Sequence, residues 1–175
     1  VTTRRVITDL PKKLPENFAV LSGVCLAGRV IETGAFTARV QLVTDSGFEL
    51  RCQIHRVIDP ANPRQVREQG RLLPLTRDVN FPVEVVARGD GARHLVIDDL
   101  KEVHNIRPGD ILQTRPDMGW MPAPVAIGVV ESVSDNLEYR GRVVARIKPS
   151  ADLASLRDVY IVYPAVDPLH REGGR

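Results

Sequence analysis

His55 and the segment Asp45-Ser46-Gly47 come closest to a catalytic arrangement in this sequence. A Ser-His-Asp triad needs a serine activated by a histidine, a carboxylate that orients the histidine, and donors for the oxyanion. Here Ser46 lies in a predicted hairpin turn nine positions before His55, and no separate nucleophile loop with an oxyanion-hole glycine pattern is present. We therefore expect surface polar residues rather than an enzyme, and a double-barrel hydrolase is disfavoured.

Two histidines, His94 and His104, could form a metal site with Asp98 or Asp99. Their ten-residue spacing fits no common pattern of zinc ligands. We expect solvated turn residues here, and no metal.

The segments 89–91 (Gly-Asp-Gly) and 107–110 (Arg-Pro-Gly-Asp) resemble phosphate or calcium loops. Neither precedes a predicted helix, and neither carries a full ligand series. Both patterns are explained by turn formation, so we expect no cofactor.

The two cysteines, Cys25 and Cys52, show no metal-ligand spacing such as C-x-x-C. Two buried free thiols and a disulfide both fit the sequence. A catalytic thiol has no surrounding motif to support it.

The composition is that of a globular protein without a basic bias. The chain has 175 residues, enough for one ordinary domain or two small ones. It carries 24 Lys plus Arg against 22 Asp plus Glu, a formal net charge of +2. Nucleic-acid-binding proteins usually present a basic face, so we expect no nucleic-acid partner.

The pattern along the chain predicts β-strands almost throughout. Short runs rich in Val and Ile alternate with turn residues, and 13 Gly and 13 Pro leave few windows for a helix. We predict an all-β fold of two small antiparallel β-barrels or barrel-like sheets, with few short helical turns. Closing sheets into barrels removes aggregation-prone edges.

The first cluster, residues 24–54, predicts an antiparallel meander of three strands. Phe36, Ala38, Val40 and Leu42 alternate with polar residues and are expected to share one face. Residues 45–47 predict a hairpin turn, with 48–54 returning beside the preceding strand. Residues 59–78 are predicted to be a loop, with at most one helical turn.

The second cluster contributes the remaining predicted strands, at 83–87, 94–97, 111–114, 125–133, 139–147 and 159–163. Residues 152–158 could form one or two helical turns. The predicted organisation is a first β-barrel subdomain over 1–80, a second over 81–166, and a polar tail over 167–175. Strand exchange between the two subdomains would make them discontinuous.

Two long stretches, residues 95–163 and 26–45, carry sequence patterns that resemble the MreC family of rod-shape-determining proteins. Residues 145–153 (Ala-Arg-Ile-Lys-Pro-Ser-Ala-Asp-Leu) with 156–162 are similar to the family's "v-x-P-x-A-D-L-x-x-L-x-x-V-x-v" ending. Residues 125–133 and 107–110 are similar to its "vGxVxxV" strand and "GD" turn, and 26–45 to its "GxVGrViE" segment. The loop at 59–78 and the segment at 115–121 depart from the family pattern.

The resemblance implies a non-enzymatic extracytoplasmic scaffold of the bacterial cell-elongation machinery, periplasmic and anchored to the inner membrane. The implied partners are a second copy, forming a dimer or larger assembly, a cell-wall transpeptidase, and MreD- and MreB-type proteins. The chain begins with Val1 and is expected to be a piece of a longer protein, and the resemblance implies a membrane anchor in the upstream segment.

The sequence offers two candidate protein-contact regions. Met118, Trp120 and Met121 lie in a Pro-bounded loop and could form an adaptable binding patch, or fold back to plug a barrel end. Tyr160 and Val162 share one face of the last strand and could support self-association by edge pairing.

An oligosaccharide- or oligonucleotide-binding barrel is the alternative function. It would need aromatic and basic residues interleaved on one sheet face. The eight aromatic residues are instead scattered along the chain.

Overall fold

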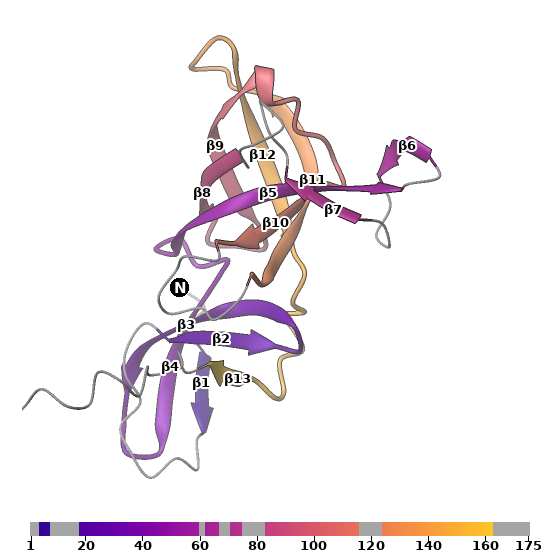
Figure 1. The fold of residues 1–175 in the computed structure, drawn as a ribbon. Helices are drawn as coiled ribbons and strands as arrows, with labels where there is room; N and C mark the ends of the chain where they lie inside the picture. Colours follow the sequence, from indigo (N-terminus) through magenta and orange to yellow (C-terminus); the bar gives the residue numbers. More distant parts are fainter. Residues whose placement is uncertain are drawn as a thin grey trace, which may run out of the picture.

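The structure of the chain is a computed structural model, and it describes residues 4–7, 18–59, 62–66, 71–74, 83–115 and 124–162. The described part is mostly β-strand with almost no helix, as the sequence predicts (Figure 1). The strands are β1 (Arg4–Ile7), β2 (Ala19–Ser22), β3 (Cys25–Thr33), β4 (Thr37–Leu42), β5 (Glu49–Asp59), β6 (Asn62–Val66), β7 (Arg71–Pro74), β8 (Val83–Gly89), β9 (Leu95–Lys101), β10 (Ile111–Thr114), β11 (Ala126–Asp135), β12 (Arg142–Pro149) and β13 (Tyr160–Val162).

One short 3₁₀ turn, η1 (Glu102–His104), interrupts the strands. The helical turns expected over 152–158 are absent from the structure, which has bends and irregular backbone there. No helix in the described ranges has the length and apolar character needed to cross a membrane.

Six strands close into an antiparallel barrel. The order is β11-β10-β5-β8-β9-β12, and the pairing of β12 with β11 completes the ring. Figure 1 shows this barrel as the upper part of the molecule. A closed ring leaves no unpaired edge among these strands.

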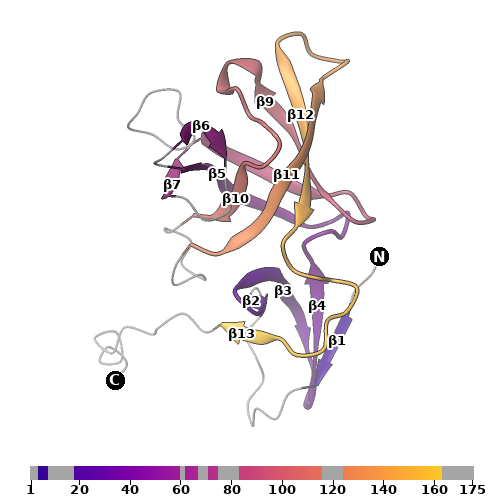
Figure 2. The same ribbon diagram turned by 90° about the vertical axis from the view of Figure 1, so that its right-hand side faces the viewer.

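Five of the seven remaining strands form an antiparallel sheet in the order β1-β4-β3-β2-β13, while β6 and β7 pair with β5. It lies beneath the barrel in both ribbon views (Figures 1 and 2). A single parallel pairing, Ala126 of β11 with Cys25 of β3, joins the sheet to the barrel. The fold class predicted from the sequence is therefore confirmed.

Strands that precede residue 80 in the sequence pair with strands that follow it, in both parts of the fold. β5 pairs with β8 and β10, while β13 returns to the N-terminal sheet beside β2. The predicted subdomain limits at residues 80 and 166 stay a prediction.

The expectation that residues 48–54 pair with the strand before them is wrong. A turn does form at residues 45–47, with the Phe48 N–H donating to the Asp45 carbonyl at 2.8 Å. The chain then leaves the sheet, and β5 enters the barrel. Phe48, Leu50, Cys52 and Ile54 are all buried, so pairing in the barrel hides the apolar face of this strand.

The loop expected over residues 59–78 contains two strands, β6 and β7, both paired with the outer half of β5. Pro63 and Pro74 lie in them. Proline removes a ladder donor and is tolerated at sheet edges, which explains why the sequence pattern looked like a loop.

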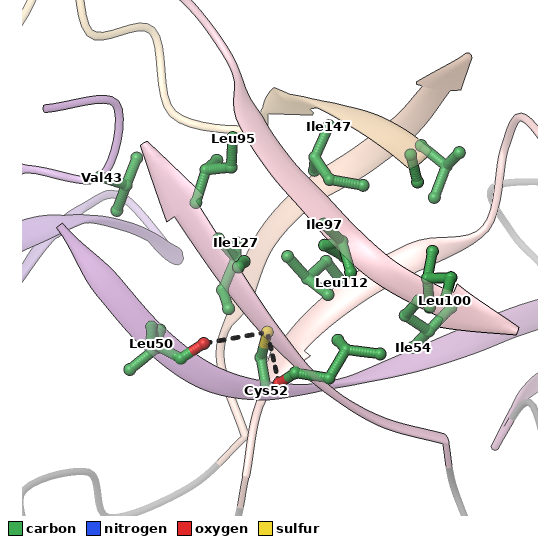
Figure 3. Close-up of a cluster of buried hydrophobic side chains, with 14 of the residues drawn as sticks. Val43, Leu50, Cys52, Ile54, Leu95, Ile97, Leu100, Leu112, Ile127 and Ile147 are labelled. Atoms are coloured by element: carbon green, nitrogen blue, oxygen red, sulfur yellow. Dashed lines mark hydrogen bonds between the residues drawn. The ribbon is translucent and has the colours of Figure 1, made fainter. Parts of the chain in front are cut away.

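Two apolar clusters hold the fold together. The larger fills the barrel and takes in Leu50, Ile97, Leu112 and Ile127, which Figure 3 shows pointing toward one another. The smaller lies in the sheet and consists of Val20, Val30, Ala38, Val40 and Leu42. Leu153 packs against both clusters.

Phe36 is the exception to the predicted alternation of β4. Ala38, Val40 and Leu42 are buried as expected, but Phe36 is 76% exposed. It precedes the first residue of β4 and lies in the bend between β3 and β4, so the strand's alternation does not extend to it.

Cys52 lies inside the barrel cluster, and its Sγ is within 3.5 Å of the Leu50 carbonyl oxygen and 3.7 Å of that of Val85 (Figure 3). Burial raises the pKa of this thiol to about 12. Cys25 is half-buried, and both cysteines are free. Of the two alternatives for Cys25 and Cys52, the structure therefore shows free thiols and not a disulfide.

Candidate functional site

A groove of about 650 Å³ lies where the barrel meets the N-terminal sheet. Its walls come from three separate parts of the chain: the end of β4, the turn between β8 and β9, and the end of β12 with the segment after it. The lining residues are Leu42, Thr44, Ala92, Arg93, Lys148, Pro149, Ser150, Ala151, Asp152, Leu153 and Ala154.

The first wall is fixed by the turn after β4. The buried Asp45 carboxylate accepts the Leu42 N–H at 3.1 Å, which closes the turn. The Thr44 carbonyl accepts the Gly91 N–H at 2.8 Å, so the second wall is tied to the first. At Gly89 a Cβ atom would lie 2.1 Å from the Asp45 carbonyl oxygen. Only glycine permits this approach.

The third wall is the Pro-Ser-Ala-Asp-Leu stretch, which follows the last barrel strand. The Ser150 N–H donates to the Ile127 carbonyl at 3.0 Å, and Ala151 is buried. The Asp152 carboxylate accepts the N–H groups of Ala154 and Ser155 at 3.2 and 3.3 Å, which holds the bend. The stretch therefore joins the barrel to the sheet and shapes the groove between them.

The charges of the groove are mostly positive. Arg93 and Lys148 line it and are both exposed, and neither side chain forms an ion pair with another described residue. The carboxylate of Asp152 is engaged in the hydrogen bonds of its own bend. Since more than half of the lining residues are apolar, the groove combines an apolar lining with two available cations.

The opposite end of the barrel carries exposed apolar side chains. The hairpin between β11 and β12 has Leu137 fully exposed at 100% and Tyr139 at 59%. Val103 of η1 is 56% exposed, and the Glu102 N–H donates to the Gly141 carbonyl at 3.1 Å, so η1 lies beside the hairpin. We call residues 135–141 the hairpin tip.

The Arg107-Pro-Gly-Asp110 turn is a structural element of the barrel. Its Asp110 carboxylate is fully buried and accepts hydrogen bonds from Arg56 Nε at 2.7 Å, Arg56 Nη2 at 2.8 Å and the Arg107 N–H at 2.8 Å. All of these donors come from the protein itself. The prediction that this segment forms a turn is confirmed.

The candidate triad residues do not assemble. Asp45 is buried and accepts the Leu42 N–H, while Ser46 is exposed. His55 lies well along β5, where it pairs with Ile111 and Pro74. An extended strand rises about 3.3 Å per residue, so His55 lies roughly 20 Å from the start of β5.

The candidate metal ligands His94 and Asp98 also contact other residues rather than each other. His94 Nε2 lies 3.0 Å from Glu131 Oε2, and His94 Nδ1 lies 3.6 Å from Asp90 Oδ2. Asp98 pairs with Arg88. Within the described ranges, no group of three or more metal-ligating side chains is present.

The predicted protein-contact residues have different outcomes. Met118, Trp120 and Met121 lie outside the described residues. Tyr160 is 65% exposed, as a contact residue would be, but Val162 packs against the barrel cluster. The sequence reasoning missed Leu137, although a Leu between Asn136 and Glu138 in a polar turn is a readable signal. It also missed the groove, whose walls come from distant segments.

Comparisons with known proteins agree on one family. A family model described as "Rod shape-determining protein MreC, barrel core" matches residues 12–163. A search of the curated proteins finds no significant match.

Solved structures share the fold. A structure described as MreC has a TM-score of 0.63 at 23% identity, covering 85% of this chain and 70% of that one. MreC from Pseudomonas aeruginosa gives 0.63 at 22% identity, with coverage of 85% and 80%. A complex between Penicillin-Binding Protein (PBP2) and MreC from Helicobacter pylori gives 0.60 at 17% identity, with coverage of 93% and 88%. With the family match over most of its length, the chain belongs to the MreC family of rod shape-determining proteins.

Proposed function

We propose that this chain is the extracytoplasmic, non-enzymatic part of a scaffold that binds cell-wall synthesis proteins during cell elongation. The observation that carries the proposal is the Helicobacter pylori complex, in which a protein of the same fold is bound to a penicillin-binding protein. Membership of the rod shape-determining family supports the same role.

The surface of the chain is consistent with a protein that works by contact. At one end of the barrel lies a groove with two cations, Arg93 and Lys148, that form no ion pair with another described residue, and at the other end lies an apolar hairpin tip. Exposed apolar groups on a soluble domain commonly mark interaction sites. A scaffold of this kind acts by holding its partners at high local concentration along the membrane.

The finer parts of the proposal concern assembly and anchoring. We include self-association as a dimer or larger assembly, contacts with MreD- and MreB-type proteins, and anchoring of the full-length protein to the inner membrane. The loop with Met118, Trp120 and Met121 stays the sequence-based candidate for the transpeptidase contact, with Tyr160 and Val162 for self-association.

Among the described residues, the exposed aromatic side chains give no support to the alternative of an oligosaccharide- or oligonucleotide-binding barrel. Phe36, Tyr139 and Tyr160 lie respectively in the bend before β4, in the hairpin tip and in β13. A stacking platform needs aromatic side chains in sequence along one face.

The test is a direct binding titration of the chain against the penicillin-binding transpeptidase of the same bacterium. We expect saturable binding, weakened by Trp120→Ala and unchanged by Phe36→Ala, an exposed aromatic control outside that loop. Single-stranded DNA and soluble peptidoglycan fragments serve as competing ligands. No binding to the transpeptidase, together with binding to either of those ligands, would favour the alternative instead.

A further inference from the structure

The barrel is closed between β8 and β9 by a short pairing. Among the described residues, Arg88 with Val96 and Gly89 with Leu95 are the pairs across this boundary, which we call the seam. On its other side, β8 pairs with β5 along six of its seven residues. Every strand of the ring has two neighbours, but residues 83–87 of β8 have a described ladder partner on the β5 side alone.

The alternation of backbone groups shows which residues of β8 face the seam. In an antiparallel ladder, the N–H and C=O of one residue point to one neighbouring strand, and those of the next residue point to the other. The Gly89 N–H donates to the Phe48 carbonyl at 3.0 Å, on the β5 side. Counting back along the strand, the backbone groups of Glu84 and Val86 therefore face the seam.

The ladder stops where β9 has a bulge. Continued pairing would place Asp98 opposite Val86, two residues beyond the last pair. Instead, the Asp98 carbonyl accepts a hydrogen bond from Asn136 Nδ2 at 3.1 Å. The register of β9 with β12 also shifts here, between Val143 and Ala145. A bulge bends its strand and increases the local twist, so β9 turns away from β8 at this point.

A pocket of about 410 Å³ lies along the seam. Val85, Val86 and Ile97 supply apolar surface to its lining. Arg51 also lines the pocket, although it belongs to β5, the strand beyond β8. The seam therefore combines backbone hydrogen-bonding groups, apolar surface and a cation, which together suit an extended peptide.

Arg51 is the cation of the pocket that is available to a ligand. It is exposed and forms no ion pair with another described residue. Arg51 is the ladder partner of Val86, so the two side chains lie on the same face of the sheet. A carboxylate placed beside Val86 would therefore meet the Arg51 guanidinium. The other charged residues of the lining form ion pairs within the molecule: Arg88 with Glu49 and Asp98, Glu84 with Arg115, and Asp99 with Arg142.

We propose that the seam binds an extended peptide segment of a partner protein, which adds to β8 as an antiparallel strand. The backbone of the peptide pairs with Glu84 and Val86, as in other cases of strand addition to a sheet. The peptide residue opposite Val86 is acidic and faces Arg51. The residues on either side of it are apolar and face Val85 and Ile97. This deepens the proposed function, on which it rests, because it names the form in which a partner of the scaffold is recognised.

The test uses a synthetic peptide with this alternation, acetyl-Thr-Val-Glu-Val-Thr-amide. Heteronuclear NMR spectra of the isotope-labelled chain are recorded across a titration, because amide shifts both detect weak binding and locate it. We expect saturable shifts that are largest around Glu84 and Val86. The same peptide with an N-methyl group on its glutamate lacks the donor that faces Val86, so it should bind about tenfold more weakly.

Val86→Pro blocks the seam from the side of the chain. Proline has no N–H, and the N–H of Val86 faces the seam rather than β5, so the ladder with β5 keeps its hydrogen bonds. The variant should bind the peptide about tenfold more weakly than the parent chain. Val86→Thr is the matched control, since it keeps both the N–H and a branched side chain, and it should bind as the parent chain does. Circular dichroism checks that both variants are folded, and the N-methyl peptide tests the same hydrogen bond without altering the chain.

The role of Arg51 is tested by exchanging charges. Arg51→Glu should weaken binding of the glutamate peptide by about threefold to tenfold. The same variant should bind a peptide with lysine in place of glutamate more tightly than the parent chain does. Lys148→Glu is the control, because it makes the same change of charge at an exposed residue outside the pocket, and it should alter neither affinity.

The proposal is overturned if the peptide produces no saturable shifts, or if the shifts lie away from β8 and β9. It is also overturned if the N-methyl peptide binds as the unmodified peptide does, or if a folded Val86→Pro binds as Val86→Thr does. The proposed function is tested separately, by titrating the parent chain against the transpeptidase. Loss of that binding alone would count against the proposed function, and loss of peptide binding alone would count against the seam as a site.

Discussion

Arg56 and Asp110 form a bidentate ion pair, with Nε–Oδ1 and Nη2–Oδ2 distances of 2.7 and 2.8 Å. The Asp110 side chain is fully buried, and that of Arg56 is 16% exposed. Arg56 also donates to the Asn105 carbonyl at 2.9 Å, where the backbone adopts the left-handed conformation with φ of 51°. One guanidinium therefore fixes β5 to the turn that leads into β10.

Replacing Asp110 with Ala should be strongly destabilising, because it leaves the largely buried Arg56 cation without a carboxylate. We expect a loss of about 3 kcal/mol in the free energy of unfolding, measured by urea denaturation. Glu32→Ala is the matched control: its pair with Arg39 has a 2.9 Å separation but side chains 61% and 45% exposed. Removing that pair should cost about 0.5 kcal/mol or less. Equal losses for the two variants would contradict this account.

The two cysteines should differ sharply in reactivity. Cys25 is half-buried, whereas Cys52 is fully buried and has a pKa of about 12. The thiolate is the reactive form, so at mildly alkaline pH Cys52 is both shielded and protonated. A thiol-titrating reagent should label one cysteine in the native chain and the second only after unfolding. The assignment is checked with Cys25→Ser, which should abolish the native signal. Rapid labelling of both thiols in the native chain would show that the barrel opens easily.

His55 should make the barrel less stable in mild acid. Burial lowers the pKa of this histidine, so the folded state binds its proton less readily than the unfolded chain does. The unfolded chain takes up the proton near pH 6.5. The stability contribution is therefore complete above that pH and is lost as the pH falls toward the lower pKa of the folded state.

The measurement for His55 is urea denaturation across this pH range, on the chain and on His55→Gln. The variant should show a shallower fall in stability between neutral and mildly acidic pH. His94 lies beside two carboxylates, so His94→Gln is the matched control. Parallel curves for His55→Gln and the parent chain would assign the pH dependence to other groups.

Much of the fold follows from local patterns. The alternating residues Leu50, Cys52 and Ile54 predict a strand with one buried face, and the turn at 45–47 is predicted by its Asp-Ser-Gly chemistry. The partner of that strand does not follow, because pairing with β8 and β10 depends on contacts far apart in the sequence. The strands β6 and β7 do not follow from the sequence either, because they contain Pro63 and Pro74. Proline argues against a central strand but is tolerated in a strand at the edge of a sheet.

The candidate surfaces likewise include features that the sequence predicts and features that only the assembled fold reveals. Leu137 could be read from the sequence as an apolar residue in a polar turn, and the Pro-Ser-Ala-Asp-Leu stretch as a family signature. The groove could not, because Thr44, Arg93 and Lys148 come together only when the sheet and barrel are assembled. The stretch has a physical role that a signature does not reveal: Leu153 packs against both apolar clusters.

Gly89 of β8 lies tightly against the turn after β4, and Gly89→Ala should disturb this contact. The added Cβ would lie 2.1 Å from the Asp45 carbonyl oxygen and 2.5 Å from the Thr44 carbonyl carbon. Both atoms belong to the backbone, so the turn itself must shift and overpacking costs about 2 to 3 kcal/mol.

Urea denaturation measures this loss, with Gly47→Ala as the control. There the nearest atom is the flexible Gln41 Nε2 at 3.2 Å, which can move aside at little cost. Equal losses of stability for Gly89→Ala and Gly47→Ala would contradict this account.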